Sequence, residues 1–593
     1  MRFVLVTMLT LLMSVGLVAQ PVPEKWLTPF ELSGFRKTPP YDETMAYCTK
    51  LAKASPFIRI ASFGKSPEGR DMPLIIVSKD RIFDPAKARR SGKAIVLIQN
   101  GIHAGEIDGK DACLMLMRDM LITKTKISLL QNVVLLVIPF YNVDGHERIG
   151  PYNRVNQNGP DEMGWRVTGQ NLNLNRDYMK ADAPETQAWL KLFTAWMPDM
   201  LVDCHVTDGA DFQHVVTYSM ENHEDLSAPV RSWVNGRFVP TMKAEMQSIG
   251  LPIVPYVNLK DEKDISKGLT EGVPPPRFST AYAALQNRPA LLIETHMLKD
   301  YKTRVDGTYK LLAITLKKII DDRDVLHKAI VDAETQTAMH LESPFPLQWR
   351  LVDASNGMLH FLGYKMNIEK SDISGADKVV WTHDPLDLDI PLYDSVEVTV
   401  SVKPPVAYII PQQWVEVINR LKMHGVLLEK LDKPIELNVE HYKFSDAKWQ
   451  QNPYEGHHPV RYTTTTFTAK ETYPAGTIVA RMNQRAARVL INALEPTAPD
   501  AFVAWGFFDA IFEQKEYGEG YVLEKMASDM IAKDSALKQE FENKLQADTA
   551  FAHAPYQRLN FFYQHSPYWD KSLNVYPISR LMENIELPVV SAR

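Results

Sequence analysis

The first half of the sequence predicts an α/β fold with a mixed central sheet and helices on both faces. Short, continuously apolar runs recur there, as is typical of strands buried on both sides. The clearest runs are residues 94–99, 133–139, 200–202 and 290–293. Segments with helical periodicity alternate with them, at residues 108–121 and 185–196. Because such alternation favours parallel neighbours in a sheet, we expect parallel or mixed pairing.

The chain is too long for a single hydrophobic core. It has 593 residues, whereas single cores stop growing near ~250–300 residues. We expect a signal peptide at residues 1–20 and the α/β domain at residues 21–340. A β-rich α+β region is expected at residues 341–445, followed by a mainly helical region at residues 446–593.

Local patterns predict the elements of these later regions. A long helix is expected at residues 309–341, where it closes the α/β domain. Residues 445–475 are polar and rich in threonine, histidine and aromatic side chains, and we expect a loop there. Helical patterns return at residues 486–494, 501–514 and 520–547.

The N-terminus has the pattern of an export signal. Arg2 is followed by an apolar run at residues 3–18 and then by small residues. This run is shorter than the ~20 residues of a membrane span. We therefore expect a secreted or periplasmic protein, with an uncleaved membrane anchor as the alternative. No later run is apolar enough to predict a transmembrane span after signal removal.

Charge and cysteine content exclude two classes of protein. The formal net charge is −6 and both signs are scattered along the chain, unlike the basic footprint of a nucleic-acid-binding protein. Three cysteines allow at most one internal disulfide, so the fold is not a disulfide-built scaffold.

Three residues form the candidate metal site. His103 and Glu106 follow the predicted strand at 94–99, and His205 follows the strand at 200–202. In open α/β sheets, ligands bind beyond the carboxyl ends of the strands, so these side chains are expected to meet. Three protein ligands with an open position for water are typical of catalytic zinc. The sequence therefore predicts one Zn²⁺ per chain.

Further strand-end residues can join this chemistry. Glu294 ends an apolar strand, where an ionisable side chain is unusual, and it is the best candidate for a general base. The alternative is a buried ion-pair partner. His296 competes as a fourth ligand or as a neighbour of the ligands. Cys204 lies beside His205, but in an alternating strand its side chain points to the opposite face.

Two arginines lie between the metal-ligand candidates. Arg166 and Arg176 both belong to the stretch GWRVTGQNLNLNRDY. Guanidinium groups bind carboxylates in bidentate fashion and can also stabilise a developing oxyanion. One arginine for the reaction and one for a substrate carboxylate is a coherent division, and structural salt bridges are the alternative.

Six motifs occur in the order GIHAGE, NVDG, WR…NLNR, APET, DCH and IETH. Over residues 40–325 the chain resembles the zinc carboxypeptidase family (peptidase family M14, carboxypeptidase A-like). The resemblance implies a carboxypeptidase-like α/β fold with zinc held by His103, Glu106 and His205. It also implies that Glu294 is the general base.

The same resemblance implies how a substrate is held. Arg166 would assist the carbonyl oxyanion, and Asn175 with Arg176 would grip the C-terminal carboxylate. The family's mobile substrate-binding tyrosine has no secure match. Tyr282, in RFSTAYAALQ, is the candidate we name, and Tyr256 competes with it.

Two positions depart from the family pattern. Gly105 stands where digestive members often carry an arginine, so one accessory carboxylate contact is missing. Asn173 stands where aspartate commonly bonds the first ligand histidine. A neutral amide can still accept a hydrogen bond, but it raises the basicity of the imidazole less.

These residues predict a secreted zinc metallopeptidase that hydrolyses the C-terminal peptide bond through a metal-activated water. Its partner would be a peptide with a free C-terminus. A zinc deacylase or amidase acting on acylated amino acids or cell-wall peptides is one alternative, and a non-catalytic peptide-binding protein is another. The C-terminal half shows no catalytic pattern and could serve interaction or substrate gating. His457 and His458 there are expected to be exposed.

Overall fold

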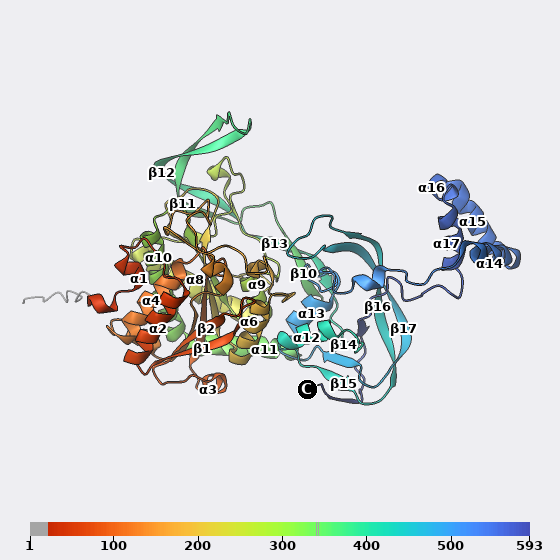
Figure 1. Ribbon diagram of the computed structural model, residues 1–593, viewed down its shortest axis with the longest axis horizontal. Coiled ribbons are helices and arrows are strands. Elements are labelled where there is room, and N and C mark those ends of the chain that lie inside the picture. Colours follow the sequence, from red (N-terminus) through yellow and green to blue (C-terminus); the bar gives the residue numbers. More distant parts are fainter. Residues whose placement is uncertain (1–21, 340, 342, 593) are drawn as a thin grey trace, which may run out of the picture.

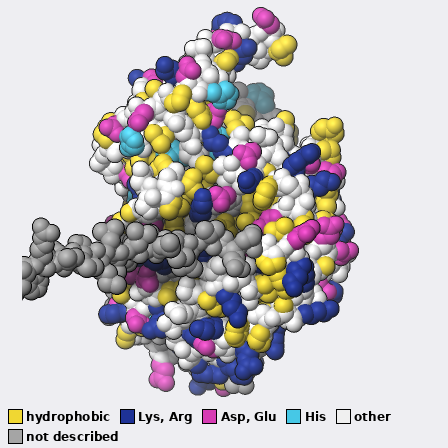
Figure 2. Space-filling model, turned by 90° about the vertical axis from the view of Figure 1, so that its left-hand side faces the viewer, with side chains coloured by type: hydrophobic (Ala, Val, Ile, Leu, Met, Phe, Trp, Pro, Cys, Tyr) yellow, Lys and Arg dark blue, Asp and Glu magenta, His cyan; other side chains and the backbone are white. Residues whose placement is uncertain are grey.

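The computed structural model describes residues 22–592 except 340 and 342. The predicted signal peptide at residues 1–20 lies outside the described residues. Within the described part of the chain, no helix has the length and apolar character needed to cross a membrane. Lys and Arg side chains are interspersed with Asp and Glu over much of the face shown in Figure 2.

An eight-stranded mixed sheet forms the centre of the first half (Figure 1), which confirms the predicted fold class. The strand order is β1-β2-β4-β3-β5-β9-β6-β7. The strands are β1 Ile58–Lys65, β2 Asp71–Val77, β3 Ala94–Asn100, β4 Val133–Ile138, β5 Met200–Thr207, β6 Val216–Ser219, β7 Val254–Pro255 and β9 Ala290–His296. The central strands β4, β3, β5 and β9 are parallel, whereas β1, β2 and β6 join by antiparallel pairs.

Helices cover both faces of this sheet. Helix α4 (Asp108–Leu121) packs so tightly on one face that a Cβ on Gly109 would lie 2.5 Å from the Cβ of Cys204. Cys204 thus faces α4, away from His205, as expected. On the other face lies α6 (Pro184–Trp196), where the Trp189 indole donates to Gln99 Oε1 at 2.8 Å.

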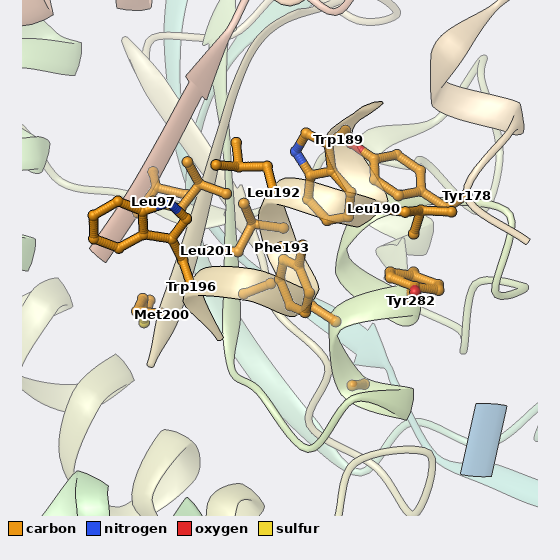
Figure 3. Packing of buried hydrophobic residues seen from close by; sticks show 14 of the residues in the cluster. Leu97, Tyr178, Trp189, Leu190, Leu192, Phe193, Trp196, Met200, Leu201 and Tyr282 are labelled. Atoms are coloured by element: carbon orange, nitrogen blue, oxygen red, sulfur yellow. The ribbon is translucent and has the colours of Figure 1, made fainter. Parts of the chain in front are cut away.

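An aromatic cluster fills the core between this second face and its helices (Figure 3). Trp189 and Phe193 of α6 stack with ring centroids 4.8 Å apart, and Tyr178 and Tyr282 close the cluster. Tyr282 comes from α9 (Ser279–Leu285), which also lies against this face. Aromatic side chains of this size supply much of the apolar area that stabilises a core.

The expected long helix at 309–341 is two helices. They are α10 (Tyr301–Asp321) and α11 (Arg323–Met339), which flank Asp322. The Asp322 carboxylate accepts hydrogen bonds from the Trp233 indole at 3.0 Å and from Arg237 at 2.9 Å. These contacts fix Asp322 at the junction between the two helices, and no pattern in the local sequence reveals them.

The C-terminal half is an α+β region, as predicted. Its main sheet has the order β17-β16-β19-β14-β18-β15-β20. The strands are β14 Ala407–Ile410, β15 Glu429–Leu431, β16 Ile435–Trp449, β17 Val460–Tyr473, β18 Ile478–Arg481, β19 Ser579–Leu581 and β20 Val589–Ser591. The helices include α12 (Val415–Met423), α13 (Ala487–Leu494), α14 (Gly520–Lys533), α15 (Ser535–Ala547), α16 (Thr549–Ala552) and α17 (Pro555–Gln564).

Two local expectations in this half are wrong. Most of the expected loop at 445–475 is strand, because the run of β-branched threonines in β17 pairs in register with β16. The expected helix at 501–514 consists of turns and the short 3₁₀ helix Asp509–Phe512. The boundary expected between residues 445 and 446 falls inside β16, and residues 446–593 contain four strands besides their helices.

Two strand pairs join the halves. Strands β10 (Phe345–Leu351) and β13 (Val396–Val402) pair with each other. Strands β11 (Gly357–Lys370) and β12 (Asp377–Tyr393) form a long hairpin that projects from the molecule at the top of Figure 1. The base of β12 pairs in parallel with β8 (Leu269–Thr270), a short strand of the first half. This contact fixes one wall of the site described next.

Candidate active site

The three predicted metal ligands come together at the carboxyl ends of β3 and β5. His103 and Glu106 lie in the turn between β3 and α4, and His205 lies in β5. Their candidate donor atoms all lie within 4.8 Å of one another, and all three residues are buried. The turn after β3 thus supplies two candidate metal ligands, and the neighbouring strand β5 supplies the third.

The imidazole orientations suit metal binding. His103 Nδ1 lies 3.1 Å from Glu106 Oε1, and His205 Nδ1 lies 3.0 Å from Glu106 Oε2. The opposite ring nitrogens face outward, His103 Nε2 to Asn173 Oδ1 at 3.2 Å and His205 Nε2 to Asp203 Oδ2 at 3.1 Å. Ligand histidines commonly hold such outer partners.

This set of residues fits a divalent metal. His103 Nδ1 is buried without a hydrogen-bond partner, and the nearest ligand oxygen, Glu106 Oε1, lies 3.1 Å away. Burial lowers the pKa of His103 to about 4, which keeps the ring neutral, as ligation requires. Burial alone would raise the pKa of Glu106, but His103, His205 and Arg154 hold it well below its usual range. The neutral His103 ring and the ionised Glu106 carboxylate are therefore ready to bind a cation. Asp203 and Glu106 raise the pKa of His205 against the opposing effect of burial, so this ring releases a proton when it binds a metal.

Glu294 lies beside this group. Strands β5 and β9 pair in parallel with His205 opposite Glu294, so the two side chains share one face of the sheet. Burial raises the pKa of Glu294 to about 8 in the metal-free site, against the opposing effect of His205. One of its carboxylate oxygens is buried without a hydrogen-bond partner. A group of this kind can exchange a proton with a reacting molecule.

One cavity of about 490 Å³ contains nearly all the predicted residues. The predicted residues that line it are His103, Glu106, Arg166, Asn175, Arg176, His205 and Glu294. His296, the candidate for a fourth ligand or a neighbour of the ligands, does not line this cavity and instead contacts Asp211 Oδ1 at 2.8 Å.

Tyr282 does not reach the cavity, so its assignment as a substrate-binding residue is corrected. It is fully buried in the aromatic cluster around α6. Its hydroxyl contacts His424 Nδ1 at 2.9 Å and accepts a hydrogen bond from Gln286 at 2.9 Å. The competing residue, Tyr256, does line the cavity, and its hydroxyl lies 3.3 Å from Asp208 Oδ1.

Arg154 is a cavity residue that the sequence did not reveal. Its guanidinium lies 2.8 Å from Glu106 Oε1, closer than Arg166 at 3.3 Å. Its aliphatic stem lies over Gly105, where a Cβ would be 2.7 Å from Arg154 Cγ. The glycine that departs from the family pattern therefore makes room for an arginine from another loop. The missing side chain at residue 105 was the only available signal.

The C-terminal half supports the loop that carries Asn175 and Arg176. The backbone N–H of Asn173 donates to Glu455 Oε2 at 3.2 Å. The Arg176 guanidinium stacks over Phe278 at 4.3 Å from the ring centroid. Asn175 Oδ1 is buried without a partner and is free to accept a hydrogen bond.

A second contact joins the same two segments. His457 Nε2 lies 2.7 Å from Asp182 Oδ2, so His457 is half-buried rather than exposed, whereas His458 is exposed as expected. Because Glu455 and His457 both reach across, the loop at residues 454–458 braces the segment that begins with Asn173.

Glu455→Ala is expected to raise KM for a peptide substrate about 2–12-fold with little change in kcat. One hydrogen bond that orders the Asn175–Arg176 loop is lost, worth ~0.5–1.5 kcal/mol. Steady-state kinetics on one peptide series measures the effect. Glu455→Gln is the matched control, because its amide oxygen can still accept from Asn173. Equal KM values for the alanine variant and the wild-type protein would contradict a positioning role.

Comparisons with known proteins show what this chain is similar to. Residues 44–228 match the family model described as zinc carboxypeptidase. Over these residues the predicted resemblance to the zinc carboxypeptidase family is confirmed.

Among curated proteins, the chain is similar to "Carboxypeptidase 2" of Trichophyton rubrum, with 23% identity over 493 residues, 79% of this chain and 84% of that protein. "Probable carboxypeptidase 2" of Arthroderma benhamiae is also 23% identical, over 486 residues, 78% of this chain and 85% of that protein. These matches extend well past the family model, so part of the C-terminal half is shared with these relatives.

Solved structures give looser matches. A metallo-carboxypeptidase from Burkholderia cenocepacia superposes with a TM-score of 0.35 and 18% identity, over 47% of this chain and 69% of that one. The carboxypeptidase A of Helicoverpa armigera gives a TM-score of 0.35 and 17% identity, over 50% and 75%.

Proposed function

We propose that this protein is a secreted or periplasmic zinc carboxypeptidase that hydrolyses the C-terminal peptide bond of peptides. The observation that carries the proposal is a single cavity that holds a metal-binding group, a buried carboxylate and an Asn–Arg pair. The proposed export rests on Arg2 and the apolar run that follows it.

In the proposed reaction, His103, Glu106 and His205 hold one zinc ion. When bound, the metal lowers the pKa of a water to ~7 and polarises the scissile carbonyl. Glu294 takes a proton from the attacking water and returns it to the leaving amine. Arg166 donates to the carbonyl oxygen as negative charge develops there.

Two residues at the C-terminal end of the Asn173–Arg176 segment select the substrate. Arg176 and Asn175 bind the free carboxylate, which places the last peptide bond beside Glu294. Arg154 adds a second positive charge beside Glu106, next to Arg166, and helps to hold the Glu106 carboxylate in place. Tyr256 replaces Tyr282 as the tyrosine that contacts the substrate, because it lines the cavity.

A peptide with a free C-terminus is expected to be cleaved ~30–5,000-fold faster, in kcat/KM, than its C-terminal amide. Amidation removes the partner of a charged hydrogen bond, which costs ~2–5 kcal/mol in a buried pair. Mass spectrometry of paired substrates measures the ratio.

Arg176→Met supplies the control for this ratio. It should slow cleavage of the free peptide and leave the amide unchanged, since the amide never used the guanidinium. Equal cleavage of free and amidated peptides would favour the zinc amidase or deacylase alternative. Stoichiometric zinc without turnover of any peptide would favour the non-catalytic alternative.

A further inference from the structure

A second cavity lies beside the catalytic cavity. Its volume is about 410 Å³, which falls within the ~300–1,000 Å³ that is usual for ligand pockets. Three residues, Asp208, Tyr256 and Asn258, line both cavities. Asp208 and Asn258 are exposed, so the shared rim is open to solvent and does not seal one hollow from the other. A ligand that fills the catalytic cavity can therefore extend into the second one.

The long hairpin supplies the outer wall of the second cavity. Val379 and Trp381 of β12 line it opposite residues of the first half. Trp381 also packs at the edge of a small apolar cluster, with Phe212 and Phe361 among its members, which joins the hairpin to the first half. The Trp381 side chain is half-buried, and among the residues that the structure describes no acceptor contacts its indole N–H. An indole of this kind offers a ligand both apolar area and a hydrogen-bond donor.

A bulge in the hairpin lies next to Trp381 and is held against the first half. The register of β11 and β12 shifts between Tyr364 and Met366, so residues 382–384 all stand opposite residue 365. His383, in this bulge, has a left-handed backbone with φ of 61°. Its Nδ1 lies 3.2 Å from Asp211 Oδ2. Because bulges bend a strand and re-aim the side chains beside them, this contact helps to set the orientation of Trp381.

Both strands of the hairpin are also bonded to the first half. The Gln213 side chain donates to the carbonyl oxygen of Gly363 in β11 at 2.8 Å and to that of Leu386 in β12 at 3.2 Å. The backbone N–H of Leu362 donates to His214 Nε2 at 3.2 Å. The outer wall is therefore a fixed part of the structure, although the hairpin projects from the molecule in Figure 1.

The position of the second cavity indicates which part of a peptide enters it. In the proposed complex, Asn175 and Arg176 hold the C-terminal carboxylate, and neither residue lines the second cavity. The catalytic cavity alone contains Phe278, which stacks on Arg176 and so lies near the terminal residue. Asp208, by contrast, comes directly after strand β5, which carries His205. The residues that precede the scissile bond are therefore the ones that pass the metal group and reach the second cavity.

We propose that the second cavity is a subsite for residues upstream of the scissile bond, where an aromatic or large aliphatic side chain packs against Trp381. The inference rests on the proposed carboxypeptidase function. Ala210, Val257 and Leu259 also line the cavity, so such a side chain lies among apolar surfaces. The Trp381 indole N–H donates to a peptide carbonyl. The hairpin lies beyond residues 44–228, which match the family model, so this subsite is an addition to that domain.

Acetylated peptides that all end in the same best-cleaved pair of residues test the subsite. One series lengthens by single alanines from the dipeptide to the hexapeptide, and kcat/KM is expected to rise when the peptide reaches the second cavity. The other series places one phenylalanine at each successive upstream position of the hexapeptide. At one position phenylalanine should exceed alanine ~10-fold in kcat/KM, because burial of its side chain is worth at least this factor.

Variants of the hairpin assign the effect to its wall. Trp381→Ala should remove most of the preference for phenylalanine over alanine, and Trp381→Phe should keep much of it. Val379→Ala should also lower the preference, and it decides the matter if circular dichroism shows that Trp381→Ala does not fold. Ile373→Ala is the matched control, because Ile373 lies between β11 and β12, is 97% exposed and does not line the cavity. It should keep the wild-type preference.

Two results would overturn the inference and leave the proposed function intact. One is equal cleavage of the phenylalanine and alanine hexapeptides at every upstream position. The other is a preference that neither Trp381→Ala nor Val379→Ala changes.

Peptide binding separates failure of the subsite from failure of the proposed function. If no peptide with a free C-terminus is cleaved, the proposed function fails, and calorimetric titration with the same hexapeptides still tests the subsite. At least one phenylalanine hexapeptide should bind ~10-fold more tightly than the all-alanine hexapeptide, and Trp381→Ala should abolish the difference. Equal binding of all the hexapeptides to the wild-type protein would overturn the inference by itself.

Discussion

Glu294→Gln is expected to lower kcat for peptide hydrolysis by ~10²–10⁴-fold, the usual contribution of a positioned general base. The amide keeps the shape of the side chain but cannot accept the proton of the attacking water. Glu294 lies opposite His205 on the paired strand. It is the only carboxylate in β9, so no other side chain of that strand can take its place. Steady-state assays of kcat on a peptide with a free C-terminus measure the loss.

The variant should otherwise behave like the wild-type protein. Its zinc content and KM are expected to stay close to the original values, because Glu294 is neither a proposed ligand nor part of the carboxylate clamp. Glu262→Gln, an exposed residue with the same loss of charge, should keep full activity. Undiminished turnover by Glu294→Gln would rule out its assignment as the base.

Zinc is expected to stabilise the wild-type protein, and His205→Ala should abolish both that effect and catalysis. Binding to the folded state alone stabilises by ~2.7 kcal/mol when free zinc is 100 times the Kd. The melting temperature should therefore rise on addition of zinc and fall again with a chelator. Metal analysis should find one zinc per chain.

The exposed His458 offers a matched histidine control. His458→Ala should retain the zinc stoichiometry, the thermal shift and the activity, whereas His205→Ala should show none of them. Two of the three donors cannot close a catalytic site, since hydrolytic zinc requires three protein ligands. A His205→Ala protein that still binds one zinc with the same thermal shift would disprove the assigned metal site.

Local sequence was enough to find the residues at strand ends. Each of His103, Glu106, His205 and Glu294 follows or ends an apolar run, and parallel strands bring their carboxyl ends to one edge. Their positions depend on the ends of the strands and do not depend on the path of a long loop or on the packing of a helix. The arginines of WR and NR were found by motif, and the structure places both in the same cavity.

The choice between Tyr282 and Tyr256 shows where this approach stops. Both tyrosines lie in segments of mixed polar and apolar residues, so local pattern does not say which way either ring points. Packing of α9 against α6 sends Tyr282 into the core, where His424 of the C-terminal half contacts its hydroxyl. That contact joins residues 142 positions apart and has no local signature.

The sequence by itself predicted the α/β class, and it pointed to the candidate metal ligands and the candidate base that the structure brings together, because each depends on short-range periodicity or on a residue's place at the end of a strand. Only the tertiary structure decided that Arg154 lies over Gly105 and that Glu455 accepts a hydrogen bond from Asn173. Those contacts join loops far apart in the chain. Their geometry depends on how the two halves pack and on space left by a missing side chain, which no local pattern encodes.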